Sequence, residues 1–331
     1  MIEVDKVTKY FGPVLAVDKV SFTVEKNEIV GFLGLNGAGK TTTIRILTSY
    51  LPATSGIAKV AGFDVMTQSM DVRRNIGYLP ESVPLYPEMR VEEYILFRAK
   101  LKGVPYRDRT ARVGYCLERC QLREVRSRLL GTLSKGYRQR VGLADAMVHD
   151  PPILILDEPT AGMDPKQIRV TLSLIRELGE QHTVLFSHHI LSEVEEVCER
   201  VIIINSGKIE LVQSLDELES QAMILLEVRG PTEQVASSLR GLIGVTKVDP
   251  LVTEDGVARF EVHTQDNSDL REKISETLSG KHWTVRRLER KRRRLEDAFF
   301  EVVRHDDVLL KAAPAKDKDK EAVAAGPPAK T

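Results

Sequence analysis

Cysteine is scarce in this chain of 331 residues, which contains only Cys116, Cys120 and Cys198. Three irregularly spaced thiols are too few for a disulfide framework or a four-ligand zinc site, so we expect reduced, packed cysteines. Long hydrophobic runs are absent as well: stretches such as 153–156 and 201–204 are far shorter than the about 20 apolar residues that a membrane span needs. The N-terminus also lacks the basic start and apolar core of a secretion signal, so we expect a cytoplasmic chain.

No charge of one sign dominates, because 48 Lys and Arg residues balance 48 Asp and Glu residues. The chain therefore has no global electrostatic preference for nucleic acid or anionic lipid. The exception is segment 286–294, which holds seven basic residues and one acidic residue. This basic run fits a solvated loop between a strand and a helix, a contact with an anionic membrane surface, or a contact with RNA.

The pattern of apolar residues predicts an α/β protein with two domains. Runs at 29–33, 153–156 and 183–186 are rich in Val and Ile, and each precedes a longer segment with helical periodicity. Buried strands followed by helices are typical of a parallel sheet whose ligand site lies beyond the carboxyl ends of its strands. Between 91 and 122 the apolar residues recur at helical spacing, which indicates a helical insertion at about 82–140.

The composition changes after residue 220. Short strand and helix patterns follow one another in the order β-α-β-β-α-β, which predicts a small α+β domain, possibly ferredoxin-like, over 221–304. A last helix is expected at 295–303. The tail 305–331 is rich in Ala, Pro and Lys, so we expect it to be disordered.

The segment 34–42, which reads GLNGAGKTT, matches the G-x-x-x-x-G-K-[ST] phosphate-binding loop. It follows an expected strand and precedes an expected helix, as this loop requires. Its backbone N–H groups can surround phosphate, Lys40 can reach the β and γ phosphates, and Thr41 can ligate Mg²⁺. The predicted nucleotide-binding residues here are Gly34, Asn36, Gly37, Ala38, Gly39, Lys40, Thr41 and Thr42.

A second motif ends the apolar strand 153–156 with two carboxylates, Asp157 and Glu158. Asp157 is placed to hold Mg²⁺, and Glu158 to polarise an attacking water. Acidic turn residues before Pro159 are the structural alternative. The phosphate-binding loop in the same chain favours the catalytic interpretation.

Segment 133–140, LSKGYRQR, joins these motifs and resembles the signature motif of ABC transporter ATPases. Segment 161–164 resembles their D-loop, His189 their switch histidine, and Tyr10 their adenine-stacking aromatic residue. The resemblance covers about 1–220 and implies an ABC ATPase fold with a parallel core, an antiparallel β subdomain and a helical insertion. It also implies ATP and Mg²⁺ as cofactors, catalytic roles for Lys40, Glu158 and His189, and a homodimer. In that homodimer Ser134, Gly136 and Asp164 belong to nucleotide binding.

Three further segments are similar to the separate ATPase subunit of ABC-2 type exporters, including the gliding-motility and sodium or drug export branch. They are 76–81 (IGYLPE), 189–195 (HILSEVE) and 295–299 (LEDAF). This resemblance implies an ABC-2 type membrane permease as partner, a position on the inner face of the cell membrane, and no nucleic-acid partner. An ABC-type ATPase that acts on RNA or ribosomes is the alternative, favoured only by the basic run.

Three features depart from the family or remain open. Glu81 stands where most ABC ATPases have Gln, and its carboxylate could approach Mg²⁺ but has no amide proton to donate. His188, beside the switch histidine, is expected to be non-catalytic. The apolar residues Val83, Leu85 and Tyr86 could either dock a permease helix or pack inward.

Overall fold

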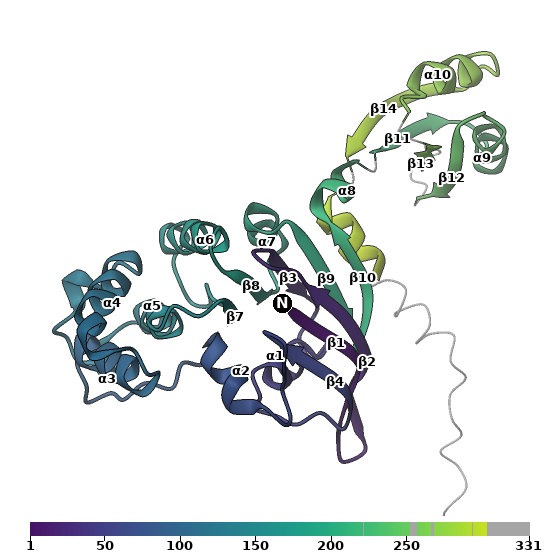
Figure 1. Ribbon diagram of the computed structural model, residues 1–331. Helices are drawn as coiled ribbons and strands as arrows, with labels where there is room; N and C mark the ends of the chain where they lie inside the picture. Colours follow the sequence, from purple (N-terminus) through teal and green to yellow (C-terminus); the bar gives the residue numbers. More distant parts are fainter. Residues whose placement is uncertain (221, 252–256, 266–267, 293, 303–331) are drawn as a thin grey trace, which may run out of the picture.

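The computed structural model describes residues 1–220, 222–251, 257–265, 268–292 and 294–302 (Figure 1). The expected disordered tail therefore lies outside the described residues. None of the helices in these ranges is both long and apolar enough to cross a bilayer. Cys116, Cys120 and Cys198 are free thiols buried in the protein, as their scarcity predicts.

A six-stranded sheet forms the centre of the larger part of the molecule, with strand order β10-β9-β3-β8-β7-β6. The pairs from β9 to β6 are parallel and β10 is antiparallel to β9. Every residue of β3, β7 and β8 is buried, which explains their continuous apolar runs. The strands are β3 Ile29–Leu33, β6 Ile76–Leu79, β7 Ile153–Asp157, β8 Thr183–His188, β9 Arg200–Asn205 and β10 Lys208–Ser214.

An antiparallel sheet of order β2-β1-β4-β5 lies against helix α1 (Lys40–Leu47) and the central sheet. Alternate residues of β2 are buried, among them Val20, Phe22 and Val24, so one face joins the core and the other faces solvent. This confirms the expected antiparallel subdomain of the fold. Its elements are β1 Ile2–Phe11, β2 Val14–Val24, β4 Ser55–Val60 and β5 Phe63–Asp64, followed by α2 Ser69–Asn75.

Helices α3 (Val91–Leu101), α4 (Tyr106–Arg119) and α5 (Lys135–Met147) pack together beyond β6, as expected for a helical insertion. In the loop before α3, Val83 and Leu85 are half-buried against the same core. This packing favours the inward alternative for these two residues, whereas Tyr86 stays 48% exposed. Its ring packs edge-on against the rings of Tyr94 and Phe97 in α3, so the helical insertion holds the Tyr86 side chain in place.

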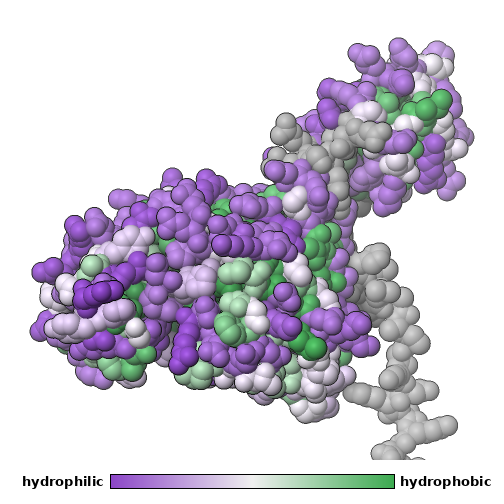
Figure 2. Space-filling model, in the orientation of Figure 1, coloured by the Kyte–Doolittle hydropathy of each residue, from purple (hydrophilic) through white to green (hydrophobic). Residues whose placement is uncertain are grey.

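Helices α6 (Pro165–Gly179) and α7 (Leu191–Val197) complete the central part, and α8 (Leu215–Ser220) leads out of it. The smaller part is a four-stranded sheet of order β12-β13-β11-β14 with two helices (Figure 1). Its core is apolar and includes Phe260, Val235 and Ile274, whereas the face of this part that Figure 2 shows is mostly hydrophilic. Its elements are β11 Ala222–Arg229, α9 Thr232–Arg240, β12 Val245–Pro250, β13 Ala258–Thr264, α10 Arg271–Ser279 and β14 Thr284–Arg292.

The basic run is mostly strand, since β14 continues to Arg292 at the edge of this sheet. The loop interpretation was therefore wrong, because β14 stays paired with β11 as far as Arg292, which lies opposite Ala222, the first residue of β11. Arg287 pairs with Glu289, and Lys291 with Asp297. Charged side chains on an edge strand oppose edge-to-edge association of sheets, which gives the basic run a structural role.

Residues 295–302 form a helix that returns to the core of the larger part (Figure 1). Leu295, Ala298 and Phe299 join the same buried cluster as the central sheet. The backbone N–H of Leu295 donates a hydrogen bond of 3.0 Å to a carboxylate oxygen of Glu195. The smaller part is thus attached at both of its ends, by α8 and by this helix.

This attachment predicts unequal effects of two adjacent substitutions. Phe299 is 8% exposed and Phe300 is 49% exposed. We expect Phe299→Ala to lower the free energy of unfolding by about 3 kcal/mol, because it leaves a cavity in the core. The matched control Phe300→Ala should cost less than about 1 kcal/mol. Urea denaturation measures both, and equal losses would contradict the placement of this helix.

Candidate functional site

Three strands deliver the site residues to one edge of the central sheet. In the parallel register Leu33 of β3 lies beside His188 of β8, and Asp157 of β7 lies beside Ser187. The segments that follow these strands therefore meet beyond their carboxyl ends. They enclose a pocket of about 370 Å³ lined by Ala16, Leu35, Asn36, Gly37, Gly39, Lys40, Thr41, Thr42, Glu81, Glu158, Ala161 and His189.

The loop between β3 and α1 takes a backbone shape that depends on glycine. Gly37 and Gly39 have φ angles of 81° and 108°, in the left-handed region that side chains disfavour. A Cβ on Gly34 would lie 2.3 Å from the carbonyl oxygen of Ile204. Only glycine, which has no side chain, therefore lets the loop approach β9 this closely. The turn places the start of α1, with its free N–H groups, at the pocket.

Lys40 extends across this loop. Its ammonium donates hydrogen bonds to the carbonyl oxygens of Gly34, at 2.7 Å, and Leu35, at 3.2 Å. Burial lowers the pKa of Lys40, while the nearby carboxylates, Glu158 first, act to raise it. The ammonium is thus held at the mouth of an anion-binding loop, opposite acidic residues.

Asp157 has one satisfied and one unsatisfied oxygen. Its Oδ1 accepts a hydrogen bond of 2.5 Å from the Ser187 hydroxyl. Its Oδ2 is buried and has no hydrogen-bond partner within the described part of the chain. Burial raises the pKa of Asp157, and the Ser187 hydrogen bond opposes this rise. The Thr41 hydroxyl and the Glu81 carboxylate both act on the Asp157 carboxyl group, so oxygen atoms of the kind that Mg²⁺ requires gather here.

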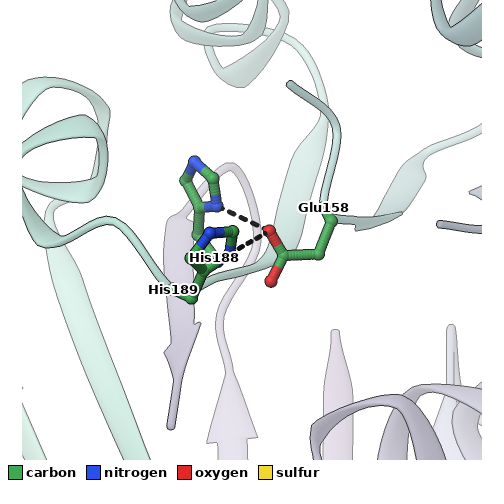
Figure 3. A group of neighbouring side chains, drawn as sticks. All are labelled: Glu158, His188 and His189. Carbon is green, nitrogen blue, oxygen red and sulfur yellow. Dashed lines mark hydrogen bonds and ion pairs between the residues drawn. The ribbon is translucent and has the colours of Figure 1, made fainter. Parts of the chain in front are cut away.

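Glu158 is held in an unusual backbone conformation, with φ at 52°. Its N–H donates to Ser187, and its carbonyl oxygen accepts from the Gln139 amide at 3.2 Å. Its carboxylate oxygen Oε2 lies 2.8 Å from Nδ1 of both His188 and His189 (Figure 3). Burial alone would raise the pKa of Glu158, but the two imidazoles outweigh it and lower the pKa.

His188 is a site residue whose contacts the sequence did not predict. Its ring is buried, and its Nε2 lies 2.5 Å from Oε2 of Glu193. Thr160 also donates a hydrogen bond of 2.8 Å to that carboxylate. These partners are 5 to 33 positions apart in the chain, so only the fold brings them together. Ala16 and Leu35, which line the pocket, were missed as well because apolar residues carry no chemical signal.

Seven predicted residues do not line this pocket. Gly34, Ala38 and Asp157 are chain neighbours of lining residues, whereas Ser134, Gly136, Asp164 and Tyr10 belong to other segments. Ser134 caps α5 by accepting a hydrogen bond of 3.4 Å from the N–H of Tyr137. Asp164 caps α6 by accepting one of 2.9 Å from the N–H of Gln167. The two helix starts are adjacent, since a Cβ on Gly136 would lie 2.5 Å from the Gln167 amide oxygen. Tyr10 is 47% exposed on β1.

The Ser187 hydroxyl generates a prediction, because it bridges the backbone of Glu158 and the side chain of Asp157. Ser187→Ala should lower the free energy of unfolding by about 1–3 kcal/mol, the cost of leaving a buried acceptor unsatisfied. Urea denaturation measures this change. The exposed Ser237→Ala serves as control and should change it by less than about 0.5 kcal/mol. No difference between the two variants would show that the bridge contributes nothing.

Comparisons with known proteins agree with this geometry. The ABC transporter family model matches residues 17–161. The uncharacterized ABC transporter ATP-binding protein YxlF of Bacillus subtilis is 35% identical over 303 residues, which is 92% of this chain and 99% of that protein. The bacitracin transport ATP-binding protein BcrA of Bacillus licheniformis is 36% identical over 229 residues, covering 69% of this chain and 74% of that protein.

A solved structure shows the same fold. The ATP-binding cassette MJ0796, a dimer in a post-hydrolysis state bound to ADP and Pi, matches with a TM-score of 0.61 and 25% identity. The match covers 65% of this chain and 99% of the cassette. The phosphate-binding loop, the parallel core and near full-length similarity to YxlF agree, and this chain belongs to the family of ABC transporter ATP-binding proteins.

Proposed function

We propose that this chain is the Mg²⁺-dependent ATPase subunit that drives a separate ABC-2 type membrane permease, in the direction of export. The observation that carries the proposal is the single pocket that combines Lys40 with Glu81 and Glu158, next to the buried Asp157. Export is supported by the relative BcrA, whose name assigns it to bacitracin transport. An RNA or ribosome partner is not supported, since the basic run that favoured it is an edge strand with ion pairs.

Each residue of the pocket has a role that follows from its position. Lys40 and the N–H groups of the loop 34–42 would bind the β and γ phosphates. Thr41, Glu81 and Asp157 would hold Mg²⁺, which supplies positive charge against the phosphate oxygens. Glu158 would accept the proton of the attacking water, since its carboxylate reaches into the pocket. His189, 55% exposed at its side chain, would contact the γ phosphate.

The remaining predicted residues point to a homodimer. Ser134 and Gly136 at the start of α5 and Asp164 at the start of α6 lie together but outside the pocket of their own subunit. We infer that they complete the nucleotide site of a second copy, as the dimeric state of MJ0796 supports. Tyr10 would stack on adenine with its exposed ring.

The organisation of the chain follows from these roles. Residues 1–220 would form the nucleotide-binding domain, with its helical insertion at about 82–140, and residues 221–304 the small α+β domain. The permease would hold the subunit at the inner face of the membrane. Tyr86, which is exposed beside the insertion, would take part in that contact.

If Glu158 is the general base, its substitution should slow ATP hydrolysis without weakening ATP binding. Glu158→Gln keeps the size of the side chain but removes the proton acceptor, so hydrolysis should slow by roughly 10² to 10⁴ while ATP affinity persists. Lys40→Ala should instead weaken ATP binding, because it removes the charge that faces the phosphates. Phosphate release and equilibrium binding measure the two quantities. Near-normal turnover of Glu158→Gln would remove the proposed base.

The homodimer predicts a second, independent result. Glu158→Gln protein with ATP should sediment as a dimer, because the bound nucleotide is not consumed. Adding Ser134→Arg should return it to a monomer by placing bulk and charge where the phosphate of the other subunit lies. Exposed Arg107 offers the control Arg107→Ser, which should leave the dimer intact. Dimers that tolerate Ser134→Arg would contradict this interface.

A further inference from the structure

Three metal-ligating atoms meet beside the nucleotide pocket. They are Oε2 of Glu158 and the Nδ1 atoms of His188 and His189, all within 4.8 Å of one another (Figure 3). Both nitrogens lie 2.8 Å from the same carboxylate oxygen. The two rings are nearly perpendicular, at 87°, so they approach this oxygen from different directions. Hydrolysis as proposed uses Glu158 and His189 but gives no role to His188.

The second ring nitrogen of His188, Nε2, has the kind of partner that usually orients a metal-bound histidine. Its Nε2 lies 2.5 Å from the Glu193 carboxylate, which is itself fixed by the Thr160 hydroxyl. A carboxylate that accepts the second N–H of a histidine is the usual partner of a metal-bound imidazole. With the proton on Nε2 directed at Glu193, Nδ1 presents a lone pair to the lone pairs of Glu158. These facing lone pairs require either a second proton or a cation between them.

The donor set selects the class of cation. Two imidazole nitrogens and one carboxylate oxygen suit Zn²⁺, whereas Mg²⁺ prefers oxygen ligands alone. Ligands at about 2.0–2.1 Å from Zn²⁺ lie about 3 Å apart or slightly more, so the two N···O separations of 2.8 Å need only small shifts. His189 is half-exposed and leaves room for water as a further ligand. The three thiols are buried and do not compete for zinc.

We propose that Glu158, His188 and His189 bind one Zn²⁺ ion in the nucleotide-free subunit, with Glu193 orienting His188 from behind. This site is separate from the residues assigned to Mg²⁺, which are Thr41, Glu81 and Asp157. Zinc would occupy the carboxylate oxygen that hydrolysis requires, so the bound state is an inhibited one. The binding itself does not depend on the proposed transport function.

The test titrates Zn²⁺ into the tag-free full chain without nucleotide, in competition with a chromophoric chelator. The parent protein should bind one equivalent. His188→Gln and His189→Gln should each weaken binding at least about 10-fold, since each removes a ligand. Glu193→Gln should weaken it by roughly 10- to 100-fold although it does not touch the metal. The control His282→Asn lies in the smaller part of the molecule, at a φ of 57° that Asn tolerates, and should bind like the parent.

Two results would overturn the proposal: equal affinity in the parent and both histidine variants, or a loss of binding in His282→Asn. His189 is half-exposed, so we expect His189→Gln to fold. This variant therefore tests zinc binding even where His188→Gln fails to fold. Inhibition of ATP hydrolysis by zinc is measured in a separate assay from zinc affinity. If the protein binds zinc as expected but does not hydrolyse ATP, the zinc site is supported and the proposed function is contradicted.

Discussion

The parallel pairing of β3, β8 and β7 is the constraint on which the rest of the site depends. Backbone hydrogen bonds fix Leu33 beside His188 and Asp157 beside Ser187, within a layer that is buried on both faces. A slip of one strand would expose apolar residues and leave polar backbone groups unpaired, so the register is strongly specified. The phosphate-binding loop and the acidic residues are therefore brought together by the core of the protein and not by flexible loops.

Charge balance at this edge determines what the pocket can do. Lys40 is partly desolvated and faces several carboxylates, while Asp157 is buried and contributes negative charge beside it. Both features favour a ligand that brings phosphate to the lysine and a cation to the aspartate. Glu158 is different, since two imidazole nitrogens already contact one of its carboxylate oxygens. Release of Glu158 from these rings would be part of preparing the site for hydrolysis, and zinc would oppose that release.

The sequence was most informative where chemistry and local structure coincide. The segment 34–42 requires glycines, a lysine and a threonine at fixed spacing, and the loop is observed between the expected strand and helix. By contrast, the partners of His188 come from the turn after β7 and from α7, a juxtaposition that no short pattern encodes. The basic run was misassigned because charge suggests a loop, whereas edge strands also carry charge. Val83 looked exposed beside prolines, but tertiary packing covers it.

One subunit is proposed to hold only part of the nucleotide site, because Ser134 lies outside the pocket that contains Lys40 and Glu158. The most direct measurement is the rate of ATP hydrolysis per subunit as a function of protein concentration, with the oligomeric state followed by sedimentation. If the site is completed by a second subunit, the rate per subunit should rise with concentration and parallel the fraction of dimer. A constant rate per subunit down to concentrations at which the protein sediments as a monomer would contradict this proposal.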